Sequence, residues 1–264
     1  MVYRFELKRQ LTGILLWAFV LAAVLWLLVY GFYPIFLDCR PIMENYIASF
    51  PAGFAEAFGF NLDDLFGMDS FFSLVYLYEA LLGAIMMTVT AVSVFGREKK
   101  EKCADFLMTK PVRRSVIFGK KLLACLTLLV MGDLPYLALF VISRRDFGNM
   151  ETITGQVWLS MLCLPLTQLV FLSIGVFAAV FLRRIRSAAG LGTGIGMFAF
   201  LLSVVHSLTE KEAFKFLSPL FYFSPQAVAD TGGYDVPCVV LAVMLMLILT
   251  GAAFWKYTRE DLTV

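Results

Sequence analysis

The fold is decided by residues 96–114, which read GREKKEKCADFLMTKPVRR. Seven basic and three acidic side chains lie in this stretch, and the sequence on either side of it is strongly apolar. A segment with this charge cannot lie in hydrocarbon, so it must lie in water at one face of a membrane. Cys103, Phe106 and Leu107 fall on one side of a helix drawn over Lys102–Lys110, which predicts a short amphipathic helix there.

The composition places the chain among membrane proteins. Apolar side chains make up 60% of the 264 residues, and charged side chains make up 16%. Soluble proteins are about half apolar and about a quarter charged. We therefore expect an integral membrane protein with one transmembrane domain over residues 1–264 and no large soluble domain.

Six stretches are apolar over the roughly 20 residues that a membrane-spanning helix needs. These predicted spans are residues 12–37, 71–95, 116–143, 157–182, 187–208 and 236–257. The predicted fold class is therefore an all-α integral membrane bundle with six transmembrane helices. Residues 1–11 are expected to form a helix on the membrane surface that turns into the first span, and residues 96–115 form the loop between the second and third spans.

Basic residues are distributed unevenly between the two faces of this predicted bundle. Of the 22 Lys and Arg residues, 17 fall on the face that holds the 96–115 loop and both termini, and five fall on the other face. Loops rich in Lys and Arg stay on the cytoplasmic side. Both termini and the 96–115 loop are therefore predicted to be cytoplasmic, in a multi-pass protein of the cell membrane.

A series of short motifs follows in order along the charged stretch and into the next span. They are Glu98 and Glu101, Asp105 with Leu107 and Met108, Pro111-Val112 with Arg113 and Arg114, and Gly119-Lys120. This order resembles the cytoplasmic loop of type-2 ATP-binding-cassette (ABC) exporter permeases. In that family an acidic residue precedes Gly-Thr-x-Glu-x-Leu-Leu, Pro-Val-x-Arg and Gly-Lys; here Lys102-Cys103 stand where Gly-Thr is usual.

Three further segments fit the same family in the same order. They are Glu6-Leu7-Lys8-Arg9 leading into Trp17, Leu217-Ser218-Pro219 followed by Tyr222-Phe223-Ser224-Pro225, and Tyr257-Thr258-Arg259-Glu260-Asp261-Leu262. The first resembles the family's N-terminal surface helix, and the second resembles the outer segment before its last span. The third resembles its Phe-x-x-Arg-Asp-Leu ending, with Glu260 inserted.

The resemblance implies a permease subunit of an exporter in a bacterial plasma membrane, with a second permease subunit as homodimer or heterodimer. It implies a coupling helix in the 96–115 loop that docks on a separate cytoplasmic ABC ATPase. The implied docking residues are Glu98, Glu101, Lys102, Asp105, Phe106, Leu107, Pro111, Arg113 and Arg114. The chain has no Gly-Lys-Ser/Thr phosphate loop, so ATP and magnesium are expected in the ATPase and no cofactor here. Membrane lipids are the other expected partners, and nucleic acid is not one.

A simpler reading of the charged stretch is a loop that only sets the orientation of the chain. That role needs Lys and Arg alone. It does not explain the apolar side of the predicted helix or the interleaved Glu98, Glu101 and Asp105.

Two carboxylates, Glu79 and Asp133, fall inside predicted spans, where a charge costs on the order of 3 kcal/mol. Asp133 lies in mid-span near Pro135, which removes a backbone hydrogen bond. A functional role, a partner on another helix and a water-filled cavity are all open for Asp133. Glu79 lies in the outer half of its span, within reach of the interface.

Four glycines alternate along the fifth span and form two overlapping Gly-xxx-Gly pairs. They are Gly190, Gly192, Gly194 and Gly196. Such pairs let helix backbones approach closely in a membrane. We expect them to serve helix packing within or between subunits, with hinge motion as the alternative.

No catalytic or metal-binding constellation is evident, so neither an enzyme nor a metal site is predicted. His206 is the single histidine, and the cysteines show no CxxC spacing. A disulfide between Cys39 and Cys238, which both fall near the predicted outer face, is open. The rivals to the exporter are an ion-gradient-driven secondary transporter, although no internal repeat is evident, and an intramembrane enzyme or a passive immunity-type membrane protein.

Overall fold

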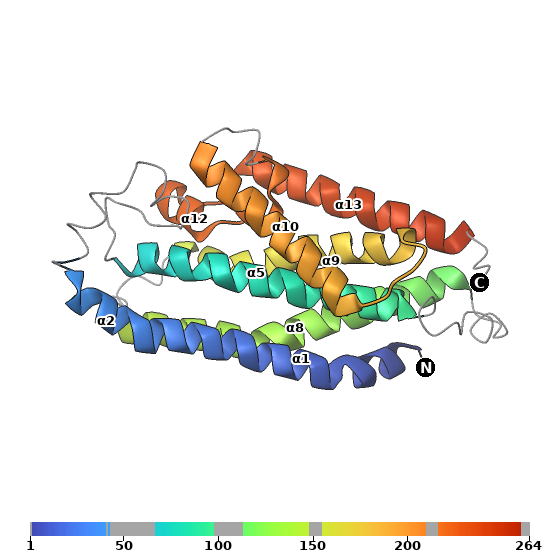
Figure 1. Cartoon of the computed structure of the whole chain (residues 1–264), viewed down its shortest axis with the longest axis horizontal. Coiled ribbons are helices and arrows are strands. Elements are labelled where there is room, and N and C mark those ends of the chain that lie inside the picture. The colour runs from blue at the N-terminus through green and yellow to red at the C-terminus, as the bar shows by residue number, and fades with distance from the viewer. Residues whose placement is uncertain are drawn as a thin grey trace.

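A computed structural model describes residues 2–40, 42, 67–97, 113–147, 155–209 and 216–259 (Figure 1). Over these residues the chain is helical and contains no strand, as the predicted all-α fold requires. The predicted amphipathic helix at Lys102–Lys110 lies outside the described residues.

The described helices follow the order of the predicted spans, with short segments between them. They are α1 (Val2–Trp26), the π-helical η1 (Leu27–Phe32), α2 (Tyr33–Asp38), α5 (Met68–Phe95), α8 (Arg114–Phe147), α9 (Gly155–Phe181), α10 (Ala188–Thr209), the 3-10 helix η3 (Pro219–Phe221), α12 (Pro225–Thr231) and α13 (Val236–Arg259).

Six helical segments in the described part of the chain are long and apolar enough to cross a membrane, which confirms a multi-pass membrane protein. They cover Val2–Asp38, Phe71–Phe95, Arg114–Phe147, Gly155–Phe181, Ala188–His206 and Val236–Arg259. The first has 37 residues and the third has 34. At 1.5 Å per residue these two are about 55 Å and 50 Å long, against a hydrocarbon core of about 30 Å. Because α1 is continuous from Val2 to Trp26, residues 2–11 of the predicted surface segment form one helix with the first span.

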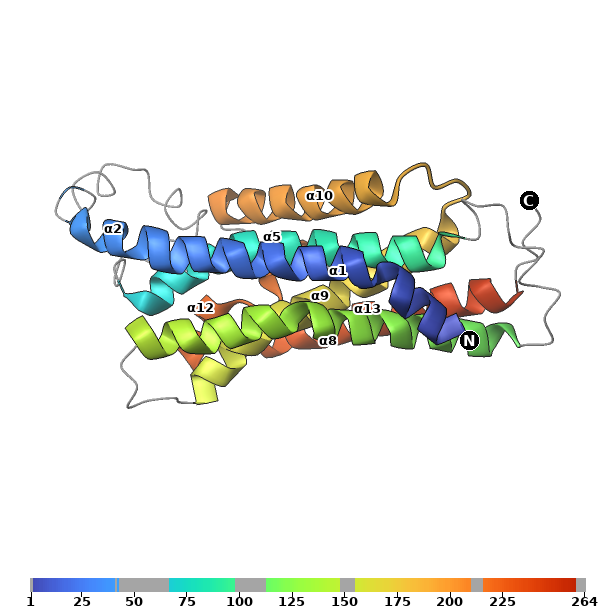
Figure 2. The same cartoon turned by 90° about the horizontal axis from the view of Figure 1, so that it is seen from below.

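Helices α5 and α9 form the centre of the bundle. Figure 1 shows α1 and α8 on one side of them and α10 and α13 on the other, and Figure 2 shows α1 lying along α5. The most apolar parts of α5 and α9 are each 61% buried, whereas those of α10 and α13 are 22% and 17% buried. Helices α10 and α13 therefore present most of their apolar side chains outward.

The contact between α10 and α5 depends on two of the four alternating glycines. A Cβ atom on Gly192 would lie 2.9 Å from the Val89 backbone nitrogen, and one on Gly196 would lie 2.5 Å from Ile85 Cγ1. Gly194 has open space where its Cβ would be. The structure thus places the Gly192–Gly196 pair in helix packing within the chain, where small residues allow close approach.

The bundle has two ends that differ in chemistry. We call the end with Arg97 and Arg113, which lie at the two ends of the charged stretch 96–114, the island end. The opposite end, with α2 and α12, is the far end (Figure 1). At the far end, the rings of Tyr33 and Phe36 lie 4.8 Å and 5.6 Å from the ring of Phe71, measured between centroids. Aromatic packing therefore fixes α2 and its neighbouring turn against the start of α5.

The segment between α10 and α13 is fixed by a buried tyrosine. The Tyr222 hydroxyl donates a hydrogen bond to the Phe216 carbonyl oxygen at 2.5 Å. Burial raises the pKa of Tyr222 to about 12, so the hydroxyl stays a donor at neutral pH.

The two cysteines near the far end form no disulfide with each other. Cys39 is half-buried, and the Cys238 thiol is buried and lies 3.5 Å from Asp235 Oδ2.

Candidate functional site

Arg97, the last described residue before the charged loop, is bound to α1. Its Nη1 atom lies 2.7 Å from Glu6 Oε2, and its guanidinium lies 5.5 Å from the centre of the Phe5 ring. The Arg97 and Glu6 side chains are 11% and 5% exposed. Coulomb attraction is stronger in such a poorly solvated place than at the surface. The ion pair therefore joins the end of the second span to the N-terminal turns of α1.

Beyond the charged loop, Lys121 of α8 binds the end of α5. Its Nζ atom donates a hydrogen bond to the Val94 carbonyl oxygen at 2.8 Å and lies 5.7 Å from the centre of the Phe95 ring. The last carbonyl groups of a helix lack partners within the helix and carry the negative end of its dipole. A buried ammonium group there joins α8 to α5 about two turns after Arg114.

The end of α5 also contacts the connection between α9 and α10. A Cβ atom on Gly96 would lie 2.5 Å from Ile185 Cδ1, so only glycine leaves room for that side chain. On the other side, the Phe95 and Tyr257 rings meet edge to face, with centroids 6.4 Å apart. The end of α5 therefore contacts α1, α8, α13 and residues 182–187.

Only two of the nine residues implied in ATPase docking are described by the structure. Arg113 is exposed and Arg114 is half-buried at the start of α8. The other seven, Glu98, Glu101, Lys102, Asp105, Phe106, Leu107 and Pro111, lie outside the described residues.

In the middle of the bundle, three helices place polar side chains together. Glu79 of α5 and Asp133 of α8 are 0% and 1% exposed. Gln168 of α9 donates a hydrogen bond from Nε2 to Asp133 Oδ1 at 2.9 Å. Tyr136, one turn after Asp133 on α8, is fully buried and lies near both carboxyl groups. We call Glu79, Asp133, Tyr136 and Gln168 the central polar cluster.

Both carboxylates gain a definite environment from the structure. For Asp133, the bond from Gln168 supplies the partner on another helix, one of the alternatives that the sequence leaves open. The sequence places Glu79 within reach of the interface, but in the structure its side chain is buried. It belongs to α5, which has neighbours on most sides, and its side chain is therefore enclosed.

A glycine makes the contact between α5 and Gln168 possible. Gly83 lies one turn after Glu79, and a Cβ atom on it would lie 2.8 Å from Gln168 Nε2 and 2.9 Å from Leu164 Cδ1. Three residues before Glu79, the Tyr76 hydroxyl and Thr167 Oγ1 form a hydrogen bond between α5 and α9, at 2.8 Å. The two helices therefore meet through polar contacts at the level of the cluster.

Five oxygen atoms of the central polar cluster have no hydrogen-bond partner among the described residues. They are both carboxyl oxygens of Glu79, Asp133 Oδ2, the Tyr136 hydroxyl oxygen and Gln168 Oε1. An unpaired buried polar group costs about 1–3 kcal/mol, and more when it is charged. This concentration of unpaired atoms is what distinguishes the cluster from ordinary packing.

Prolines interrupt the helices on which the cluster lies. Pro135 follows Asp133 by two residues on α8, and Pro165 precedes Gln168 by three residues on α9. Proline has no N–H, so the carbonyl groups of Met131 and Met161, four residues earlier, lose their usual helical partners. Both helices therefore have a weakened backbone ladder beside the cluster.

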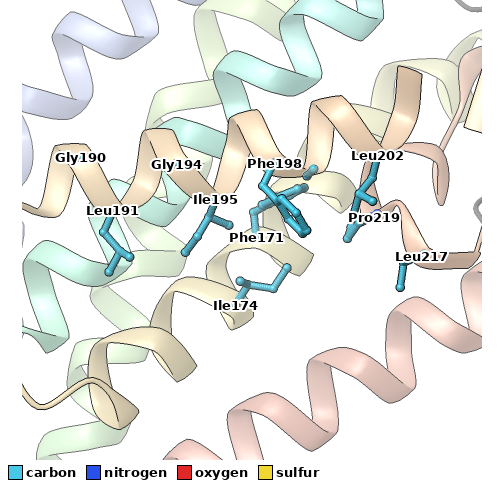
Figure 3. A pocket seen from close by; sticks show the side chains of 11 residues that line it. Phe171, Ile174, Gly190, Leu191, Gly194, Ile195, Phe198, Leu202, Leu217 and Pro219 are labelled. Atoms are coloured by element: carbon cyan, nitrogen blue, oxygen red, sulfur yellow. The ribbon is translucent and has the colours of Figure 1, made fainter. Parts of the chain in front are cut away.

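An apolar groove lies between α9, α10 and the residues that follow α10 (Figure 3). Its volume is about 550 Å³, and its lining includes Phe171, Ile174 and Phe198, with Leu217 and Pro219 at one end. Gly190 and Gly194, the glycines that do not pack against α5, also line it. The two predicted Gly-xxx-Gly pairs thus face different surroundings.

Gln168 and Tyr136 are functional candidates that sequence reasoning missed. A signal for Gln168 exists, because it is the single Asn or Gln residue within the six predicted spans. An amide inside a span needs a partner on another helix. No comparable signal marks Tyr136, since tyrosine is common in membrane spans near the interfaces.

The described residues contain no group of three or more His, Cys, Asp or Glu side chains that could hold a metal ion. No protein-family model matches this chain, and no curated protein matches it. The fold of the described residues is that of a multi-pass membrane protein, with six helices long and apolar enough to cross a membrane.

Proposed function

We propose that this chain is the permease subunit of an ABC-type exporter, which contributes to the translocation path and is driven by a separate cytoplasmic ATPase docked on residues 96–114. The observation that carries the proposal is the attachment of both ends of this loop to the bundle. Arg97 is paired with Glu6 before the loop, and Lys121 binds Val94 after it. A loop that only sets orientation needs neither contact.

When the ATPase displaces the loop, the first element to move is α5, which the loop follows directly. Helix α5 packs against α1, α8, α9 and α10, so a shift of its end moves several contacts at once. Tightly packed interiors change between discrete arrangements and do not deform continuously. Closure of an ATPase pair would push on the 102–110 helix, with Pro111 stiffening its exit, and the bundle would change its arrangement.

The distribution of Lys and Arg supports an orientation with the island end and both termini in the cytoplasm, in a bacterial plasma membrane. Phe106 and Leu107 would fill a cleft on the ATPase, and the neighbouring charges would set the register. ATP and magnesium belong to that partner. The outward apolar faces of α10 and α13 are available to a second permease subunit and to lipid.

Co-purification tests the docking surface. The intact chain, co-expressed with the ABC ATPases of its source genome, is expected to retain one of them in mild detergent. The double variant Phe106→Asp/Leu107→Asp should lose that ATPase, because two charges replace the apolar contact. A matched control exists at the far end: Phe216→Asp/Leu217→Asp changes the same dipeptide at exposed positions and should retain the ATPase.

Two results would contradict this function. One is an intact chain that retains no ATPase at all. The other is equal retention by the Phe106→Asp/Leu107→Asp variant and the far-end control, which would move docking away from residues 96–114.

The buried carboxylates favour a second candidate, a secondary transporter driven by an ion gradient. Ionisable side chains inside membrane spans are frequent in proton relays and ion pathways, and Glu79 and Asp133 are both enclosed. Transport by cells that persists without ATP and stops when a protonophore is added would support this candidate. Transport that needs ATP and withstands the protonophore would exclude it.

A further inference from the structure

The central polar cluster has more hydrogen-bond acceptors than donors. An ionised carboxylate accepts only, and the free oxygen of the Gln168 amide also accepts only. If Glu79 and Asp133 were both ionised, the Tyr136 hydroxyl and the second N–H of the Gln168 amide would be the two donors for four unpaired acceptor atoms. The cluster would then hold two negative charges and too few donors.

The helices that form the cluster bring no cation to it. Helices α5 and α9 contain no Lys, Arg or His. On α8 the nearest basic residues are Lys121 and Arg144, about 18 Å and 16 Å from Asp133 along the helix axis. Lys121 binds Val94 O, and Arg144 lies 5.6 Å from the centre of the Phe72 ring.

The neighbouring helices place their basic groups at the two ends of the bundle. Helix α1 carries Arg4, Lys8 and Arg9 and α13 carries Lys256 and Arg259 at the island end, and α10 carries His206 near the far end. Helix α12 has no basic residue. The remaining titratable groups around the cluster are neutral ones, Tyr76 and Cys163, with Tyr234 beside Cys163.

We propose that the central polar cluster is a proton-binding site, in which Glu79 and Asp133 both carry protons while they are enclosed between α5, α8 and α9. Two added protons turn two acceptor atoms into donors and remove both negative charges. With the Tyr136 hydroxyl, the two new O–H groups give three donors, and the second Glu79 oxygen, Gln168 Oε1 and the Tyr136 oxygen can accept from them. This site does not depend on the proposed ATPase.

Release of the protons needs water at the cluster. Pro135 and Pro165 weaken the backbone of α8 and α9 at this level, so a rearrangement of the bundle can admit water there. Each carboxyl O–H bond then breaks, the proton passes to water, and the electron pair stays on the carboxylate. Closing the bundle requires both carboxylates to take up protons again, which links the rearrangement to protons.

Infrared spectroscopy of the purified full chain in lipid nanodiscs tests the site. A protonated carboxyl group has a C=O stretching band that a carboxylate lacks, and the wild-type chain should show it at neutral pH. Glu79→Gln and Asp133→Asn should each remove part of this band. Asp146→Asn is the matched control on the same helix: Asp146 is exposed and accepts a hydrogen bond from Tyr30 at 2.6 Å, and its substitution should leave the band unchanged.

Three outcomes would overturn the proposal. They are no acid band in the wild-type chain, an unchanged band in both Glu79→Gln and Asp133→Asn, and loss of the wild-type band when sodium or potassium is added at constant pH. The last would assign the site to a metal cation.

A further variant keeps the test valid if the carboxyl substitutions fail to fold. Tyr136→Phe removes one hydroxyl and leaves both acids in place. It should shift the frequency of the acid band and keep its total intensity, whereas an unshifted band would contradict a shared cluster.

Discussion

At the island end, the Glu6 residue is 4% exposed, and its Oε2 atom lies 2.7 Å from Arg97 Nη1. In the middle of the bundle, the carboxyl group of Glu79 is 0% exposed and has no hydrogen-bond partner among the described residues. The two groups are equally enclosed, but a cation meets only the first. Burial alone therefore does not set the charge of a carboxyl group in this bundle; the partner on the next helix does.

The largest effect is expected from breaking the pair at the island end. Arg97→Met leaves Glu6 buried without its guanidinium partner and should lower the free energy of unfolding by about 3 kcal/mol. Thermal unfolding in detergent measures the loss. The double variant Glu6→Gln/Arg97→Met should recover much of it, because no unpaired charge is left. A double variant as unstable as Arg97→Met would mean that the pair is not what joins these helices.

Adding a side chain at Gly83, beside the central polar cluster, should have a smaller effect. Gly83→Val places a side chain against Gln168 and Leu164 and should cost about 2 kcal/mol, since overpacking forces neighbours off their preferred conformations. Gly194→Val is the control, because nothing lies within 4 Å of its Cβ position. Equal melting temperatures for the two variants would show that the Gly83 contact is not tight.

The smallest effect is expected from Glu79→Gln, and the same exchange at Glu6 provides the comparison. Glu79→Gln replaces a protonated acid by a neutral group of the same shape and should change stability at neutral pH by less than about 1 kcal/mol. The same exchange at Glu6 should cost about 2 kcal/mol, because it removes the charge that Arg97 needs. A Glu79→Gln variant as unstable as Glu6→Gln would indicate that Glu79 is ionised.

The pH dependence of unfolding also tests whether Glu79 is protonated in the folded state. A carboxyl group that is protonated in the folded state and ionised in the unfolded state releases a proton on unfolding, so stability falls as pH rises. Wild-type melting temperature should therefore fall as pH rises above about 4, where carboxyl groups of the unfolded chain lose their protons, and Glu79→Gln should flatten that fall. An equal slope in the variant and the wild type would remove Glu79 from the titration.

The six spans were predictable because apolar length is a local property that hydropathy reads directly. Which spans pack against each other could not be predicted from hydropathy. Gln168 and Asp133 are 35 residues apart on different helices, and no spacing rule connects them. Burial of Glu79 depends on α5 being central, which hydropathy does not reveal.

The glycines of the fifth span show the same limit at finer scale. Gly190 and Gly194 have the same spacing as Gly192 and Gly196, yet only the second pair packs against α5. The choice is made by the face of α10 that meets Val89 and Ile85, which is a property of the assembled bundle. The docking residues between 98 and 112 stay a prediction from sequence.

The lengths of the spans have a consequence for the surrounding lipid. Helix α10, at 22 residues, is about 33 Å long and matches an average bilayer, whereas the 34 residues of α8 exceed it by about 20 Å. A helix that is too long tilts, extends beyond the hydrocarbon or thickens the bilayer around it. Acyl chain length therefore becomes a control on this protein: thick membranes favour an upright α8, and thin ones favour a tilted α8 with a different angle to its matched neighbour.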